Sequence, residues 1–124
     1  MGATLDSGSR GLRTVVLLAG FAATALLFLD LCDLAFDCGC RAFWLGAAEA
    51  CNVHNPASRH CPWCSHGFWG GAVPFGAVLG AQTAAVCWPG RWPLAVRIAA
   101  VVAALPVVGG LAALAFGLAS GYWA

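Results

Sequence analysis

Three long stretches of the sequence are almost free of charge, and this constrains the fold more than any other feature. They cover residues 14–31, 67–88 and 98–122, and Asp30 is the only formally charged residue inside them. A helix needs roughly 20 apolar residues to cross the hydrocarbon core of a bilayer. Because lipid offers backbone groups no hydrogen-bond partners, each such stretch should be a helix. The sequence therefore predicts an all-α membrane protein with three transmembrane helices.

The overall composition agrees with a place in the lipid bilayer. The chain is 61% hydrophobic and 9% charged, whereas about 25% of the residues in soluble domains are charged. The formal net charge of +1 gives no reason to expect a nucleic-acid partner. Three helices in a chain of this size bury little surface against one another. We therefore expect contacts with other membrane subunits or with a second copy of the chain.

The arginines predict the orientation in the membrane. Four of the six lie in the N-terminal segment 1–13 and the short connection 89–97, and two lie in the longer segment 32–66. Because arginine is enriched on the cytoplasmic side, we predict a cytoplasmic N-terminal segment and connection. The segment 32–66 then forms an extracytoplasmic loop, and the C-terminus is also extracytoplasmic. No small-residue cleavage site follows the first apolar stretch, so we expect an uncleaved signal anchor.

Small residues repeat every four positions in the second and third apolar stretches. The two rows are Gly76, Gly80 and Ala84, and Ala113, Gly117 and Gly121. Such rows let helix backbones approach closely in lipid. We expect the second and third helices to form an antiparallel hairpin through these rows, or to offer the rows to a partner.

Tryptophans flank the second and third apolar stretches. Trp63 and Trp69 lie at the start of the second stretch, Trp88 and Trp92 lie at its end, and Trp123 closes the third. Because tryptophan prefers the headgroup level of a bilayer, we expect each of these side chains to anchor a helix end at the membrane surface.

Cysteine and histidine are concentrated in the predicted loop. The segment 32–66 carries six of the seven cysteines and all three histidines. Thiolate and neutral imidazole are ligands that borderline and soft transition metals prefer, and the same thiols can form or exchange disulfides. The seventh cysteine, Cys87, lies at the end of the second apolar stretch, where we expect a buried free thiol.

Two ligand pairs in the loop point to a metal site. In each pair two residues separate the ligands, so that one turn of chain can bind an ion through both. The candidate ligands are Cys51, His54, Cys61 and Cys64, with His60 and His66 as alternatives. Three cysteines and one histidine would complete a tetrahedral zinc site, and copper would suit the same donors.

Two other interpretations of the same cysteines stay open. If the loop faces an oxidising compartment, structural disulfides could staple a segment that is too short to have its own core. The sequence assigns no pairing to them. Alternatively, Cys61 and Cys64 could be a redox pair, because a Cys-x-x-Cys motif at the start of a helix stabilises a thiolate.

An extracytoplasmic loop with a Cys-x-x-Cys pair at a membrane boundary is similar in outline to two enzyme families. These are the disulfide-forming membrane oxidoreductases and the vitamin K epoxide reductases. The resemblance covers Cys38 to Cys64 and implies thiol–disulfide exchange at Cys61 and Cys64. Those families use a four-helix bundle around a quinone, whereas this sequence has three candidate spans and no arginine soon after Cys64. We therefore assign the chain to neither family.

The three histidines favour the metal interpretation, because a simple disulfide framework gives them no role. We predict a small membrane protein whose extracytoplasmic loop binds zinc or copper. Such a protein would be an accessory or metal-handling subunit of a membrane complex rather than an enzyme by itself. The sequence contains no glycine-rich phosphate loop that would indicate phosphate chemistry.

Overall fold

The computed structural model describes most of the chain as helix. It describes residues 2–41, 43–46, 49, 51–88 and 90–124. Residues 1, 42, 47, 48, 50 and 89, which fall in the predicted N-terminal segment, loop and connection, lie outside the described residues. The elements are α1 (Gly2–Phe36), η1 (Phe43–Leu45), η2 (Asn52–His54), α2 (Pro62–Ser65), α3 (Gly67–Cys87) and α4 (Leu94–Ser120). No strand occurs among the described residues.

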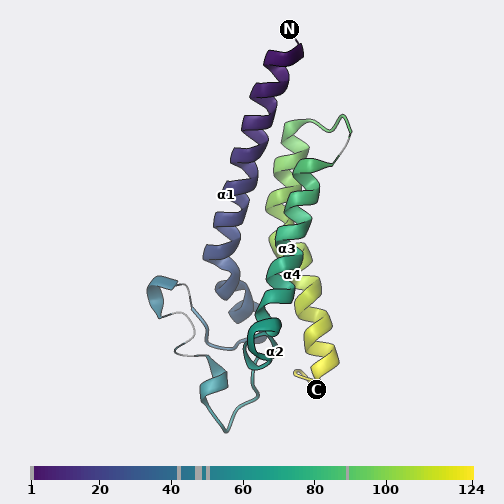
Figure 1. The fold of residues 1–124 in the computed structure, drawn as a ribbon. Helices are drawn as coiled ribbons and strands as arrows, with labels where there is room; N and C mark the ends of the chain where they lie inside the picture. Colours follow the sequence, from purple (N-terminus) through teal and green to yellow (C-terminus); the bar gives the residue numbers. More distant parts are fainter. Residues whose placement is uncertain (1, 42, 47–48, 50, 89) are drawn as a thin grey trace.

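Three of these helices are long and apolar enough to cross a membrane. The candidate spans are Arg10–Phe36, Gly67–Cys87 and Leu94–Ser120. In Figure 1 the three helices run side by side, with the N-terminus and the α3–α4 connection at one end. The C-terminus, α2 and the segment between α1 and α2 lie at the other end. α3 packs most extensively against α4, and α1 packs against both. The predicted all-α membrane protein with three spanning helices is confirmed.

The helices pack through a different face of α3 from the one that its row of small residues predicts. The buried residues of α3 are four apart and comprise Gly70, Pro74, Val78, Gln82 and Val86. Gly76 and Gly80 face outward: within the described part of the chain, a Cβ atom added at either would meet nothing within 4 Å. In the α4 row, Ala113 and Gly117 are buried, whereas Gly121 ends the helix with a φ of 66°. The expected contact between two small-residue rows is therefore wrong for α3.

A buried arginine closes the connection between α3 and α4. Arg97 lies in the first turn of α4 and is 1% exposed. Its Nη1 donates to the carbonyl oxygens of Ala85 and Val86 at 3.0 and 3.1 Å, and its Nη2 donates to that of Gly90 at 3.1 Å. Carbonyls in the last turn of a helix lack intrahelical partners and carry partial negative charge. The guanidinium group therefore caps α3 and fixes the hairpin.

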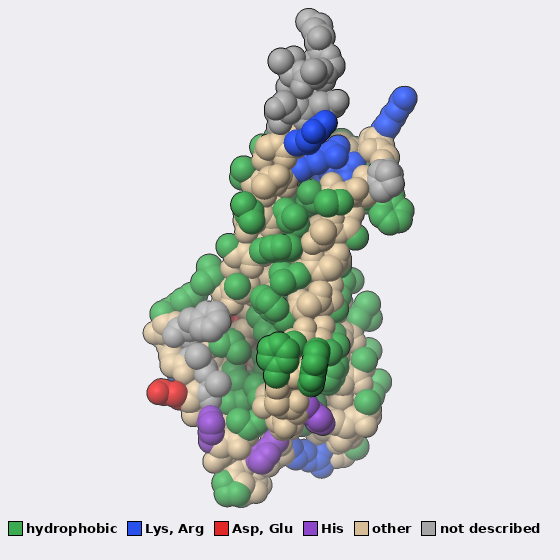
Figure 2. All heavy atoms as spheres, in the orientation of Figure 1, with side chains coloured by type: hydrophobic (Ala, Val, Ile, Leu, Met, Phe, Trp, Pro, Cys, Tyr) green, Lys and Arg blue, Asp and Glu red, His purple; other side chains and the backbone are tan. Residues whose placement is uncertain are grey.

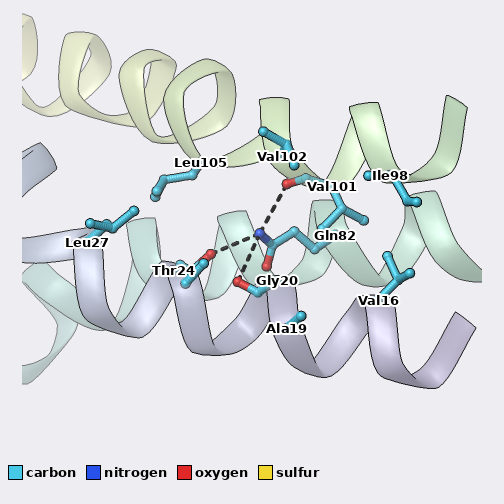
Figure 3. A pocket seen from close by; sticks show the side chains of 11 residues that line it. Val16, Ala19, Gly20, Thr24, Leu27, Gln82, Ile98, Val101, Val102 and Leu105 are labelled. Carbon is cyan, nitrogen blue, oxygen red and sulfur yellow. Dashed lines mark hydrogen bonds between the residues drawn. The ribbon is translucent and has the colours of Figure 1, made fainter. Parts of the chain in front are cut away.

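A buried glutamine joins all three spanning helices. Gln82 of α3 donates from Nε2 to Thr24 Oγ1 of α1 at 2.9 Å and to the Val101 carbonyl of α4 at 3.2 Å (Figure 3). Its Oε1 has no hydrogen-bond partner in the part of the chain that the structure describes. The amide borders a largely apolar hollow of about 300 Å³ between α1 and α4. Because a hydrogen bond between membrane helices contributes only about 0.6 kcal/mol on average, the amide mainly sets the relative positions of the helices.

Candidate metal centre

The turn that follows α1 brings two cysteines together. Cys32 lies near the end of α1, and Asp37, just after the helix, has a φ of 48°. This left-handed conformation, which Asp tolerates better than most residues, reverses the chain. The Asp33 carboxylate accepts a hydrogen bond from the Gly39 N–H at 2.8 Å and so holds the turn closed. As a result, the Sγ atoms of Cys32 and Cys38 lie 3.3 Å apart.

Asn52 ties the next segment to both cysteine-bearing turns. Its backbone N–H donates to the Cys38 carbonyl at 2.6 Å, and its Oδ1 accepts a hydrogen bond from the Cys61 N–H at 2.8 Å. Its Nδ2 donates to Tyr122 Oη at 2.8 Å, and this hydroxyl in turn donates to the Phe36 carbonyl. One asparagine therefore connects the turn after α1, the start of α2 and the chain after α4.

The short helix α2 supplies two more thiols and a buried indole. Cys61 directly precedes the helix and Cys64 lies within it, while Pro62 occupies the first position, where no N–H partner is needed. Trp63 is 3% exposed, and its ring stacks on Phe28 at a centroid distance of 4.9 Å. The expectation that Trp63 anchors the chain at the membrane surface is wrong, because its ring packs in the same buried cluster as the cysteines.

In the structure the cysteine sulfurs are not bonded to one another, and the distances between them suit a metal. Cys32 Sγ lies 3.3 Å from Cys38 Sγ and 3.2 Å from Cys61 Sγ. It also lies 3.9 Å from Cys64 Sγ, which is 3.5 Å from Cys40 Sγ. A disulfide needs about 2.05 Å, so none of these pairs is bonded. Metal–sulfur bonds of about 2.3 Å place the sulfurs of a tetrahedral site about 3.8 Å apart, within the range of these contacts.

The sulfurs form three overlapping groups that could each hold an ion. Within each group the three sulfurs lie no more than 4.8 Å from one another. The groups are Cys32, Cys38 and Cys61; Cys32, Cys40 and Cys64; and Cys38, Cys40 and Cys51. These six residues are called the cysteine cluster below. Five of them are no more than 2% exposed, so the protein largely shields the sulfurs from water.

The surroundings of Cys51 and Cys64 favour the protonated form of both thiols. Desolvation raises the pKa of the Cys51 thiol to about 12. The neighbouring Cys32 sulfur lowers the pKa of Cys64, but two other cysteines and burial raise it, and it lies at about 11. Metal ligands must be thiolates. An ion that enters the cysteine cluster at neutral pH must therefore displace protons.

Three of the four ligands predicted from the sequence lie in the cysteine cluster. They are Cys51, Cys61 and Cys64, and each of the three sulfur groups contains one of them. The structure thus divides these cysteines among different groups. No histidine joins any group among the described residues. His54 lies on η2 with an exposed side chain, and its role as a ligand stays a prediction.

The other two histidines contact backbone oxygens. His60 Nε2 lies 3.1 Å from the Asn55 carbonyl oxygen, and His66 Nδ1 lies 2.7 Å from that of Pro62. Both side chains are exposed, and Figure 2 shows the histidines at the end of the molecule opposite the N-terminus. In a neutral imidazole, the nitrogen that meets a carbonyl oxygen carries the proton, so the other nitrogen can still accept. Metal binding by these histidines likewise stays a prediction.

Cys32, Cys38 and Cys40 were not among the predicted ligands. The predicted ligands form pairs with two intervening residues, whereas Cys32 lies inside a helix and only one residue separates Cys38 from Cys40. The glycine between the last two was a usable signal, because Gly39 has a φ of 83° that favours a tight turn. Cys87 is exposed on the surface of the chain, so the expectation of a buried thiol is wrong.

An open hollow reaches the cysteine cluster from outside. It has a volume of about 450 Å³, and its lining includes Cys38 and Cys51. The side chains of Asp37, Glu49 and His54 also contribute to its wall. Carboxylate and imidazole groups attract cations and are themselves metal ligands. The hollow therefore offers a path by which an ion could approach the group that contains Cys38 and Cys51.

The chain after α4 folds back over the cysteine cluster. The Tyr122 carbonyl accepts a hydrogen bond from Arg59 Nη1 at 2.6 Å. The Trp123 ring stacks on Phe36 with a centroid distance of 5.5 Å, and it packs so closely on Gly117 that a Cβ atom there would lie 2.2 Å from the indole. These contacts link the end of α4 to the end of α1, beside the turn that carries the first cysteines.

The geometry of the cysteine cluster is the main source of functional information for this chain. Comparisons with protein family profiles, with curated proteins and with solved structures give no match.

Proposed function

We propose that the chain is a small integral membrane protein that binds a transition metal, zinc or copper, through the cysteine cluster. The observation that carries this proposal is the convergence of six cysteine sulfurs, five of them from buried residues, from three separate segments. Packing of cysteines in an apolar core does not require their sulfurs to contact one another, whereas these sulfurs lie 3.2 to 3.9 Å apart. Sulfur is a preferred donor for zinc and for copper(I).

A bound ion would also hold the segment between α1 and α2 in place. In its described residues this segment has only η1 and η2 as regular elements, each three residues long. Such a segment buries too little apolar surface to form a core of its own. Metal–thiolate bonds supply folding free energy directly, because the site does not exist in the unfolded chain. The cysteine cluster would therefore act as the core of this region.

The hollow beside Cys38 and Cys51 supports a role in metal handling rather than a purely structural one. A structural site is closed on all sides, whereas an ion that is delivered or passed on needs a route. Asp37 and Glu49 give this route a negative lining. We propose an accessory or metal-handling subunit of a membrane complex, in which a partner would exchange metal through the hollow.

The proposed orientation places the cysteine cluster on the extracytoplasmic side. The segment 1–13 and the connection 89–97, which carry four of the six arginines, belong to one end of the bundle (Figure 1). The cysteine cluster lies at the opposite end, and arginine enrichment marks the cytoplasmic side. An oxidising compartment would convert free thiols to disulfides, so a bound metal would also protect the cluster there.

The test combines elemental analysis with a count of free thiols. The protein is purified in mild detergent, its zinc and copper contents are measured, and its thiols are titrated in denaturant without reductant. We expect bound metal in the wild type and in Cys87→Ser, the matched control outside the cluster. The double variant Cys61→Ser/Cys64→Ser should lose the metal while keeping its helical circular dichroism.

Two results would overturn the proposal. A metal-free protein with one reactive thiol would mean that the six cluster cysteines form disulfides. A metal-free protein with seven reactive thiols would mean that the cluster is a reduced core. In the first case, trapping a mixed disulfide at Cys61 or Cys64 with a thiol partner would establish the alternative function of thiol–disulfide exchange.

A further inference from the structure

We propose that the cysteine cluster holds three copper(I) ions in a ring of bridging thiolates; this inference rests on the proposed metal-binding function. The structure contains three sulfur groups, and each pair of groups shares one cysteine. Cys32, Cys38 and Cys40 are the shared members. One ion in each group would give a closed ring in which three metals alternate with three bridging sulfurs.

The remaining cysteines complete the ring. Cys51, Cys61 and Cys64 each belong to one group only, so each would be a terminal ligand to one ion. Every ion then has two bridging sulfurs and one terminal sulfur. A thiolate can bridge two metals because its sulfur has several lone pairs. All six sulfurs of the cluster are used, and none is left unpaired.

The coordination number favours copper(I) over zinc. Zinc in structural sites has four ligands, but each group of the cysteine cluster supplies three. Water could serve as a fourth ligand where the hollow reaches Cys38 and Cys51, whereas Cys32 and Cys61 are no more than 1% exposed. Copper(I) is a d¹⁰ ion that is stable with three thiolates in a trigonal plane. Metal–sulfur bonds of about 2.3 Å then place the three sulfurs about 4 Å apart, so that a pair such as Cys32 and Cys61, at 3.2 Å, would separate when the ion binds.

The donor atoms favour the same ion. All ligands in the three groups are cysteine sulfurs, and none of the described histidine or carboxylate side chains joins them. Thiolate is the softest protein ligand, and copper(I) is the softest of the common biological ions that it binds. Binding needs no electron transfer: three Cu⁺ ions and six thiols give a complex with a net charge of −3, six protons pass to the solvent, and copper stays in the +1 state.

The test is an anaerobic titration of the reduced, metal-free protein in detergent with copper(I) held by a competing chelator. We expect binding to saturate at three ions per chain, one for each sulfur group. The copper X-ray absorption edge should have the form of three-coordinate copper(I), and the extended fine structure should contain sulfur neighbours and a short copper–copper path. A parallel titration with zinc alone should give fewer ions.

Two cysteine variants test the arrangement of the ring. Cys51 belongs to one group and Cys40 to two, so Cys51→Ser should bind two copper ions and Cys40→Ser should bind one. Cys87→Ser should still bind three, because Cys87 is exposed and outside every group. Helical circular dichroism and size-exclusion elution confirm that each variant is folded before its ions are counted.

The outcomes separate this inference from the proposed function on which it rests. Saturation at one ion, or tetrahedral zinc preferred over copper, would overturn the copper ring but leave metal binding intact. Equal stoichiometry in Cys40→Ser and Cys51→Ser would refute the shared-ligand arrangement. No binding of either metal by the reduced wild-type protein would overturn both proposals.

Discussion

Replacing Asn52 by alanine would break the connection between the cysteine cluster and the end of α4. The side chain makes two short hydrogen bonds: its Oδ1 accepts from the Cys61 N–H at 2.8 Å, and its Nδ2 donates to Tyr122 Oη at 2.8 Å. The Cys51 thiol also donates to Oδ1, but over 4.0 Å, which makes this a weak contact. The backbone hydrogen bond from Asn52 to Cys38 does not involve the side chain and should survive. The substitution therefore isolates the contribution of the two side-chain bonds.

The expected loss follows from these two contacts. A hydrogen bond between neutral groups contributes about 1 kcal/mol net, and a buried donor left without a partner costs about 1–3 kcal/mol. Cys61 is 0% exposed, so its N–H is shielded from water in the folded protein. Tyr122 keeps its bond to the Phe36 carbonyl. We expect Asn52→Ala to lower the free energy of unfolding by about 2–4 kcal/mol.

The assay is reversible unfolding in mixed micelles with a rising mole fraction of dodecyl sulfate. Reductant and a chelator keep the cysteines free of disulfides and metal. The fluorescence of the six tryptophans, which include the stacked Trp63, follows unfolding. Asn55→Ala is the matched control, because among the described residues its side chain accepts a single hydrogen bond, from the exposed Ala57 N–H at 3.0 Å. The control should change the free energy of unfolding by less than about 0.5 kcal/mol.

A double-mutant cycle separates the bond to Tyr122 from the bond to Cys61. Tyr122→Phe removes the hydroxyl and leaves the ring, so its coupling energy with Asn52→Ala should be about 1 kcal/mol. If Asn52→Ala unfolds within about 0.5 kcal/mol of the wild type, the reasoning about the buried Cys61 N–H is wrong. A coupling energy of zero would mean that the contact between Asn52 and Tyr122 is not formed.

Two further predictions concern groups that stabilise the ends of the bundle. Arg97→Lys keeps a charge but cannot reproduce the three hydrogen bonds, two to carbonyls at the end of α3 and one to the Gly90 carbonyl in the connection. It should lower the free energy of unfolding in the same assay by about 1–3 kcal/mol, and Arg97→Ala by about 3–5 kcal/mol. Equal stability of the Lys variant and the wild type would contradict the capping role. Burial raises the pKa of Tyr122, the single tyrosine of the chain, above its usual value of 10. Because the pKa of Tyr122 is higher in the folded protein than in the unfolded chain, its protonated hydroxyl contributes fully to the free energy of unfolding below pH 10. This contribution is lost as the pH rises through the pKa of the folded protein. In a pH titration followed by tyrosinate absorbance, the midpoint should be higher in the folded protein than in protein unfolded in dodecyl sulfate. Equal midpoints would contradict the burial of the Tyr122 hydroxyl.

The sequence predicts the spanning helices well because their signal is local. A long run of apolar residues without charge has one stable form in lipid. The packing between helices is not local in this sense, and α3 illustrates why. Two faces of α3 carry small residues: one contains Gly76 and Gly80, and the other contains Gly70. The second face is buried: Gly70 packs against α2, and Gln82 contacts α1 and α4. The spacing of glycines alone does not reveal which face meets a neighbour.

Only part of the candidate site was predicted, because the rest of it also depends on contacts between residues that are distant in the sequence. Cys61 and Cys64 were found because their spacing on one turn is a local pattern. Cys32 was not, because it is 29 residues from Cys61, the residue whose sulfur it approaches at 3.2 Å. Its inclusion depends on α1 continuing past Leu31 to Phe36 and on the reversed turn at Asp37. Neither the length of α1 nor the turn at Asp37 can be predicted from the spacing of the cysteines.

The contacts of Tyr122 have a consequence for the order in which the protein is made. Spans enter a membrane one after another, so the segment that carries the cysteines is synthesised before α4. Asn52 and Arg59 find their partners on Tyr122 only after α4 has been inserted and the chain has turned back. Until then we expect the thiols to be accessible to the oxidases and chaperones that inspect new membrane proteins. The contacts that close the cysteine cluster therefore form last, after all three spanning helices have been made.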